Sequence, residues 1–142
     1  MASYTKGSLQ CGSGNDSTSS DKGTVVLSQT KLINFDAAGT TNVDSTFILP
    51  AGSQIVQMFA DTLTAWDSAT SAGMTIGSTA GGTEYASSVD VKSNGRESLS
   101  YTAAQLAAMD DIGTSTTVYV RVAQSGATTA GQSRVTIQYV QP

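Results

Sequence analysis

The segment from Phe47 to Trp66 constrains the fold of this chain more than any other. It contains a strand-like stretch, a turn at residues 50–52 (Pro-Ala-Gly) and a second, longer strand-like stretch over residues 54–66. Proline and glycine break regular structure, whereas the β-branched and aromatic residues around them favour strands. The segment therefore predicts an all-β protein.

Both alternating faces of the longer strand carry apolar side chains, which is unusual for a strand with one face in water. The pattern predicts either a central strand whose outer face meets another subunit, or a strand in which a β-bulge exchanges the two faces midway. The residues on one face are Ile55, Gln57, Phe59, Asp61 and Leu63, and those on the other are Val56, Met58, Ala60, Thr62 and Thr64.

The rest of the chain predicts roughly seven or eight short strands separated by turns, which is typical of an antiparallel β-sandwich, here of jelly-roll type. The clearest strands are residues 116–123 and 133–140, and we expect them to pair with each other as neighbours across the loop between them. An immunoglobulin-like sandwich is the main alternative, but its Cys, Trp, Cys signature is absent. The inward-facing residues of these two strands are predicted to be Val118, Val120, Val122, Val135, Ile137 and Tyr139.

Residues 101–109 interrupt the strand pattern, because alanine and leucine dominate there. Thr102 is a suitable N-cap, so we predict one short helix over residues 102–109, with Leu106 and Met109 on a shared face. The Ser-Asn-Gly-Arg stretch at residues 93–96 predicts a turn.

Residues 1–23 are rich in Gly, Ser, Asn, Asp and Thr, whereas strand-like periodicity begins at residue 24. We therefore predict a flexible or capsid-bound N-terminal arm over 1–23 and a β-sandwich domain over 24–142. An arm of this composition could also order against the edge of a neighbouring chain. No stretch is apolar and long enough for a signal peptide or a membrane span, so a membrane is not an expected partner.

The charge pattern and composition argue against nucleic-acid binding and against catalysis. The seven Lys and Arg residues never cluster and the net charge is −4, so nucleic acid is not an expected partner. The chain has no histidine, the usual general base and zinc ligand, and its one cysteine, Cys11, has no imidazole to activate it. We expect no enzyme activity and no cofactor.

Two weaker interpretations remain open for the aspartates. Asp61 and Asp67 flank Trp66, as in a glycosidase cleft with an aromatic platform, although Trp66 could equally be a core anchor at the end of its strand. A metal site would have to combine Asp44, Asp61, Asp67 or Asp90 with backbone carbonyls, but the spacing matches no EF-hand. We predict no metal site.

Four stretches together resemble small virion proteins of tailed bacteriophages: residues 49–56, 61–68, 74–77 and 85–91. They follow the order of a strand with a Leu-Pro-Ala-Gly turn, a Thr-rich strand with an aromatic residue, a strand ending in Gly, and an acidic Asp-Val strand. The likeness covers roughly residues 47–109 and lies in turn and packing positions rather than in reactive residues.

The resemblance implies a capsid decoration (cement) protein, a homotrimer on the outer surface of the virion capsid that ties neighbouring major capsid proteins together. The alternative is a structural or receptor-binding β-sandwich of a phage tail, neck or fibre. A carbohydrate-binding sandwich would instead expose Trp66, Tyr85 or Tyr101 as platforms. The predicted subunit interface comprises Ile55, Gln57, Phe59, Leu63 and Trp66, and the predicted capsid contacts of the arm are Tyr4, Lys6, Leu9 and Lys22.

Overall fold

The computed structural model describes residues 24–36, 42–97 and 99–141. The predicted arm over residues 1–23 lies outside the described residues. The elements in chain order are β1 (Val26–Asn34), β2 (Asn42–Ile48), β3 (Gln54–Thr64), β4 (Ser71–Gly77), β5 (Ala86–Asp90), β6 (Gly95–Glu97), α1 (Ala103–Asp110), β7 (Thr117–Ser125) and β8 (Gln132–Val140).

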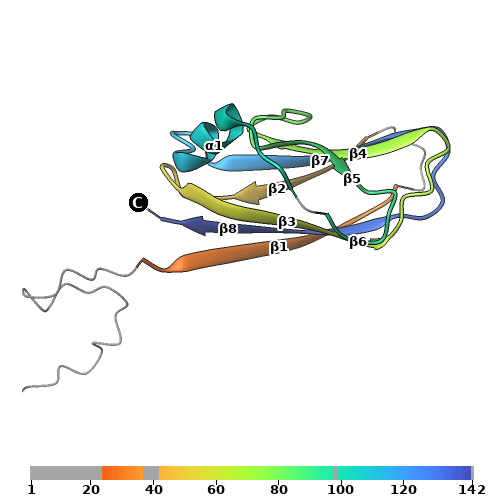
Figure 1. The fold of residues 1–142 in the computed structure, drawn as a ribbon, viewed down its shortest axis with the longest axis horizontal. Coiled ribbons are helices and arrows are strands. Elements are labelled where there is room, and N and C mark those ends of the chain that lie inside the picture. The colour runs from red at the N-terminus through yellow and green to blue at the C-terminus, as the bar shows by residue number, and fades with distance from the viewer. Residues whose placement is uncertain (1–23, 37–41, 98, 142) are drawn as a thin grey trace, which may run out of the picture.

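The strands form two four-stranded antiparallel sheets packed as layers, with α1 at one end (Figure 1). The first sheet has the order β1-β8-β3-β6 and the second sheet has the order β2-β7-β4-β5. The first strand thus pairs with the last, the second with β7, the third with β6 and the fourth with β5. This nested pairing is the connectivity of a jelly roll, so the predicted fold is confirmed.

The predicted pairing of the last two strands is wrong. β7 pairs with β2 and β4 in the second sheet, whereas β8 pairs with β1 and β3 in the first. The predicted inward residues of both strands are nonetheless buried. The two apolar rows face each other across the core, because alternation determines which face of a strand is buried but not which strand lies beside it.

A β-bulge explains the two apolar faces of β3. The pairing with β8 shifts between Ile55 and Gln57, so Ile55 points into the core while Gln57 does not. Beyond the bulge, Met58 and Ala60 are buried, and Phe59 lies on the outer face. The expectation that Ile55 shares a face with Gln57 and Phe59 is therefore wrong, and the bulge alternative is confirmed.

The predicted turn at residues 93–96 is partly replaced by a strand. Gly95–Glu97 forms β6, which pairs with β3 over Ala60–Thr62. Three residues are too few to show alternation in a sequence, which is why the strand was not predicted. Gly95 adopts a φ of 124°, a conformation that favours glycine.

The helix is confirmed, and Thr102 is its N-cap. The Gln105 backbone N–H donates to Thr102 Oγ1 at 3.2 Å, and the Thr102 N–H donates to Gln105 Oε1 at 2.9 Å. Leu106 and Met109 share a face as predicted, since both line a hollow between α1 and β3, although Leu106 is 53% exposed. Gln105 is also buried, and its amide donates to the Thr83 carbonyl at 3.0 Å. Within the described part of the chain, no helix is long and apolar enough to span a membrane.

The capping arrangement gives a first prediction. Thr102→Ala removes the acceptor for the Gln105 N–H and should lower the free energy of unfolding by about 1 kcal/mol. The measurement is a urea titration followed by far-ultraviolet circular dichroism. Thr114→Ala, at an exposed position outside the helix, is the control and should change stability by less than about 0.5 kcal/mol. Equal effects of the two variants would contradict the role of the cap.

Candidate functional site

The aspartates considered for catalysis or metal binding are engaged separately. Asp44 accepts hydrogen bonds of 2.7 Å from both Nε and Nη2 of Arg121. Asp67 accepts from the backbone N–H groups of Thr129 and Ala130, at 2.8 and 3.0 Å. The Asp90 carboxylate accepts a hydrogen bond from the backbone N–H of Lys92. Among the described residues no group of three His, Cys, Asp or Glu side chains could hold a metal ion.

Asp61 is the most enclosed of these carboxylates and lies at the centre of an ionic cluster. Its oxygens accept from Arg96 Nε at 2.7 Å, from Arg96 Nη2 at 3.2 Å and from Arg134 Nη2 at 3.2 Å. The Arg96 guanidinium also lies 4.6 Å from the centre of the Phe59 ring. The hydrogen bonds from Arg96 are the main cause that lowers the pKa of Asp61, and those from Arg134 add to it. The partners of Asp61 lie on β6 and β8 and those of Asp67 in the loop before β8, so the two carboxylates do not act as a pair.

The lowered pKa of Asp61 gives a second prediction. An aspartate whose folded pKa lies below its unfolded value of about 3.9 stabilises the fold above that pH, and the contribution is lost as the pH falls through the folded pKa. Asp61→Asn should therefore cost about 1–2 kcal/mol at pH 7, and the difference from the wild type should shrink below about pH 4.

Urea titrations at several pH values between 7 and 2.5 measure this difference. Glu97→Gln is the matched control, because no ion pair reaches Glu97 within the described residues. At pH 7 its free energy of unfolding should differ from that of the wild type by less than about 0.5 kcal/mol. A difference for Asp61→Asn that stays constant down to pH 2.5 would contradict the assignment.

The structure divides the predicted interface residues into two groups. Ile55 and Trp66 lie in the core, and the Trp66 indole Nε1–H donates to Ser133 Oγ at 2.9 Å. The interpretation of Trp66 as a core anchor is thus confirmed, and it is not a sugar platform. Gln57, Phe59 and Leu63 are accessible on the outer face of the first sheet, where the interface assignment stays a prediction. The predicted arm contacts Tyr4, Lys6, Leu9 and Lys22 lie outside the described residues.

Part of β3 has a strand neighbour on one side only. β6 pairs with β3 over Ala60–Thr62, and after Glu97 the chain runs on toward α1 (Figure 1). The edge of β3 from Gln54 to Phe59 therefore faces α1 and the segment before it rather than another strand. On this edge the Met58 carbonyl accepts from the Tyr101 hydroxyl, so side chains rather than a further strand cover this part of β3.

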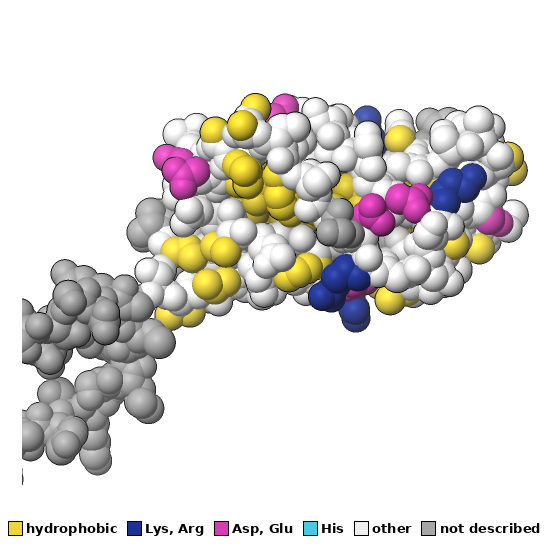
Figure 2. Space-filling model, in the orientation of Figure 1, with side chains coloured by type: hydrophobic (Ala, Val, Ile, Leu, Met, Phe, Trp, Pro, Cys, Tyr) yellow, Lys and Arg dark blue, Asp and Glu magenta, His cyan; other side chains and the backbone are white. Residues whose placement is uncertain are grey.

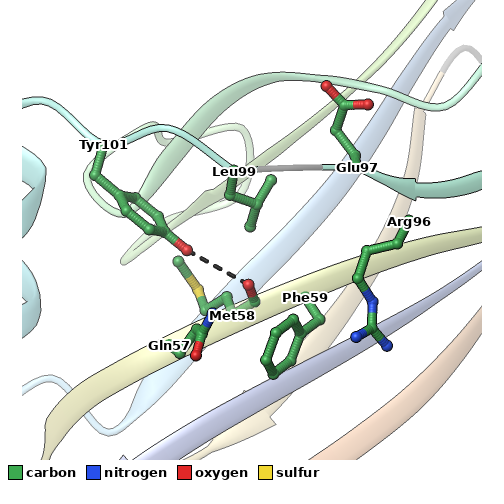
Figure 3. Close-up of a pocket in the computed structure, with 7 residues that line it drawn as sticks. All are labelled: Gln57, Met58, Phe59, Arg96, Glu97, Leu99 and Tyr101. Carbon is green, nitrogen blue, oxygen red and sulfur yellow. Dashed lines mark hydrogen bonds between the residues drawn. The ribbon is translucent and has the colours of Figure 1, made fainter.

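Two hollows follow this edge, and we call them together the β3 groove. The larger has a volume of about 370 Å³, and the smaller, of about 260 Å³, lies between β3 and α1. Successive residues of β3 line the two. The larger hollow is lined by Gln57, Met58, Phe59, Arg96, Glu97, Leu99 and Tyr101 (Figure 3), and the smaller by Gln54, Ile55, Val56, Leu106, Met109 and Asp110.

The groove combines apolar walls with a few polar groups. Figure 2 shows hydrophobic side chains gathered on this face between α1 and β3, and the exposed Val56 and Leu106 belong to the smaller hollow. In the larger hollow the Tyr101 hydroxyl donates to the Met58 carbonyl at 3.5 Å (Figure 3). Burial raises the pKa of Tyr101, so its hydroxyl keeps its proton at neutral pH. Such a groove can bind an apolar or extended ligand, but it holds no activated nucleophile.

The opposite edges of the two sheets are closed by side chains. The Gln29 amide on β1 donates to the Ile48 carbonyl on β2 at 2.8 Å, and the Lys31 ammonium donates to the Thr46 carbonyl. Lys31 also lies 5.6 Å from the centre of the Phe47 ring. Side chains thus occupy backbone acceptors that a foreign strand would need, which is a common protection of sheet edges. The β3 groove differs from these edges in its two hollows, and it is therefore the candidate binding site.

No family model, curated protein or solved structure matches this chain. The role of the groove therefore rests on its geometry. Sequence reasoning identified Gln57 and Phe59 through the apolar pattern of β3, but it missed Leu99, Tyr101 and Leu106 as groove residues. No local signal could have found them, because they reach β3 only through the path of the chain from β6 to α1.

Proposed function

We propose that this protein is a non-enzymatic structural subunit of a bacteriophage virion, a capsid decoration protein on the outer surface of the head. In this role it ties neighbouring major capsid proteins together. The observation that carries the proposal is the β3 groove, an open apolar site on a rigid β-sandwich. The resemblance of residues 47–109 to small virion proteins of tailed phages indicates which kind of assembly the sandwich serves.

The surface chemistry supports binding rather than catalysis. Asp44 and Asp61 are neutralised by arginines of the same subunit, so these charges are already satisfied before any partner arrives. Large apolar side chains are left accessible on and around the first sheet, including Val56 at 48% and Leu63 at 44% exposed. The contacts that these side chains of one subunit can make are weak, but such contacts add together when many copies bind one particle.

A homotrimer is part of the proposal, because a subunit placed on a threefold axis can bury the same surface in every copy. Gln57, Phe59 and Leu63 are the residues that we assign to this contact. Gln57 and Phe59 line the larger hollow of the β3 groove, and the exposed Leu63 lies further along the same strand. Sedimentation velocity of the purified protein measures its oligomeric state directly. A monomer at every concentration up to the millimolar range would exclude the trimer.

The decisive experiment mixes the full-length protein with undecorated phage heads and sediments them. We expect the protein to pellet with the heads in a saturable manner, and Val56→Asp to weaken this binding at least about tenfold by placing a charge in an apolar contact. Ile48→Asp, at a 61% exposed position on the second sheet, is the matched control and should bind normally. Wild-type protein that stays in the supernatant would overturn the proposal.

A second candidate is a receptor-binding module of a tail or fibre. The observation that favours it is the pair of accessible aromatic rings in the larger hollow, Phe59 and Tyr101, beside the Gln57 amide. Aromatic faces next to amides are a usual surface for sugar binding. This candidate predicts that the protein binds host cells or their glycans but not heads, and that Tyr101→Ala abolishes that binding.

A further inference from the structure

We propose that Asn94 is a site of spontaneous covalent modification, at which the backbone nitrogen of Gly95 attacks the asparagine side chain and converts it to isoaspartate. The group that reacts is the side-chain amide of Asn94, and water is the only co-reactant. The site lies at the start of β6, two residues before Arg96. The inference concerns the chain alone and does not depend on what the β3 groove binds.

The reaction has two steps, and neither of them oxidises or reduces any group. In the first, the Gly95 nitrogen loses its proton and forms a bond to Cγ of Asn94, while the bond from Cγ to Nδ2 breaks and the amide nitrogen leaves as ammonia. The product is a cyclic imide. In the second, water adds to one of the two imide carbonyls. Addition at Cγ restores an ordinary aspartate, whereas addition at the backbone carbonyl leaves the chain linked through Cγ, as isoaspartate.

The sequence confines this reaction to one position. A Cβ on the residue after an asparagine obstructs the approach of its backbone nitrogen, and glycine has no Cβ. Asn94 is the only asparagine of the chain that is followed by glycine. The residues after the other three are Asp, Phe and Val, and these asparagines are Asn15, Asn34 and Asn42.

The structure leaves Asn94 free to react. Its side chain is exposed, and within the described part of the chain no hydrogen bond or ion pair holds it. Pairing with β3 begins only at Gly95, so the ladder does not fix the backbone of Asn94. A Cβ built on Gly95 would meet no atom within 4 Å, which leaves open space around the attacking nitrogen. The φ of 124° at Gly95 also favours glycine, so the turn itself requires the reactive pair.

Two other asparagines are exposed as well, but the fold holds them in strands. Asn34 pairs with Gln132 between β1 and β8, and its Oδ1 accepts from Gln132 Nε2 at 2.8 Å. Asn42 pairs with Ala123 between β2 and β7. Ring closure requires rotation of the backbone and the side chain, and pairing in a ladder opposes it. The fold therefore protects these two asparagines but not Asn94.

Isoaspartate at this position alters β6. The new linkage adds one carbon atom to the main chain and leaves a carboxylate beside it. β6 has three residues, and Arg96 Nε donates to Asp61 Oδ1 at 2.7 Å. An extra backbone atom next to so short a strand changes its register against β3, so Arg96 loses its position over Asp61. Arg96 and Glu97 line the larger hollow, whose wall changes with them.

Mass spectrometry of the aged full-length protein tests the site. During incubation in mildly alkaline buffer, the peptide that contains Asn94 should gain about 1 Da, with isoaspartate identified by electron-transfer fragmentation. This gain should be at least about tenfold faster than at Asn34 or Asn42. Asn94→Gln, which keeps an amide but moves it away from the attacking nitrogen, should not react.

The same measurement in urea separates the role of the fold from that of the sequence. Unfolding should accelerate the reaction at Asn34 and Asn42, whereas the rate at Asn94 should stay within about tenfold of its value in the folded protein. A larger acceleration at Asn94, or equal rates at the three sites in the folded protein, would overturn the proposal.

The effect on β6 is measured with the isoaspartate form after chromatographic separation. Asn94→Asp is the matched control, because it adds the same charge without the additional backbone atom. The equilibrium constant of unfolding should be about tenfold larger for the isoaspartate form than for Asn94→Asp, through loss of hydrogen bonds between charged groups. In an Asp61→Asn background this difference should shrink. Equal stabilities of the isoaspartate form and Asn94→Asp would overturn the assigned effect on β6. None of these tests uses phage heads, so their failure is distinct from failure of the capsid function.

Discussion

Trp66→Ala should lower the free energy of unfolding by about 3–5 kcal/mol, the range that large aromatic truncations in a core produce. The Trp66 side chain is 1% exposed and is the largest fully buried side chain among the described residues. Its removal leaves a cavity and also leaves Ser133 Oγ without the indole donor. Both effects act in the same direction.

Urea unfolding followed by far-ultraviolet circular dichroism measures this loss, since the variant lacks the only tryptophan of the chain. Trp66→Phe separates the two effects, because it keeps much of the side-chain volume but removes the hydrogen bond. It should therefore lower the free energy of unfolding less than Trp66→Ala does. Leu106→Ala, at an exposed position on α1, should cost less than about 0.5 kcal/mol. A loss below about 1 kcal/mol for Trp66→Ala would contradict the role of Trp66 as a core anchor.

The features that could be predicted from the sequence are those that depend on residues close to one another along the chain. Val118, Val120 and Val122 alternate with polar residues, and burial of one face follows from this period alone. The helix was predictable for the same reason, because the Thr102 side chain caps a residue only three positions away. Interactions of this range are visible in a single sequence.

Features that depend on the path of the chain could not be predicted. β7 and β8 are consecutive strands with clear alternation, yet they lie in different sheets, and nothing in their residues specifies the partner. The groove depends on the short β6 and on the departure of the chain after Glu97, which brings Leu99 and Tyr101 over β3. The bulge at residues 55–57 was one of two possibilities, because either a bulge or a covering subunit accounts for apolar residues on both faces.

The two sides of the sandwich differ in the groups that cover their strand edges. On one side, Gln29 and Lys31 occupy carbonyls of β2, so a foreign strand cannot pair there without displacing them. On the other side, β6 pairs with β3 over Ala60–Thr62, and the Tyr101 hydroxyl donates to the Met58 carbonyl on the part of the edge that β6 leaves uncovered. The hollows of the β3 groove, rather than unoccupied backbone groups, distinguish this side of the sandwich.

Gly131→Ala should destabilise the protein by about 1–3 kcal/mol, because the added methyl group has no room. A Cβ at residue 131 would lie 2.6 Å from Cδ2 of Trp66 and 2.9 Å from two further ring atoms. The ring is enclosed by the core and cannot turn aside as a surface side chain would. The backbone of residue 131 cannot retreat freely either, since its carbonyl accepts from the Phe35 N–H at 2.9 Å.

A double-mutant cycle shows whether this clash is the cause. In a Trp66→Ala background the methyl group at residue 131 would enter the cavity left by the indole, so Gly131→Ala should cost little there or should even stabilise the fold. The two substitutions should therefore be non-additive by about 1–3 kcal/mol, measured by the same urea titrations. Additive losses would mean that the glycine is needed for its backbone rather than for the space it leaves to Trp66. Nothing in the sequence around Gly131 indicates that it contacts Trp66. The cycle therefore tests a packing contact that is known only from the three-dimensional structure.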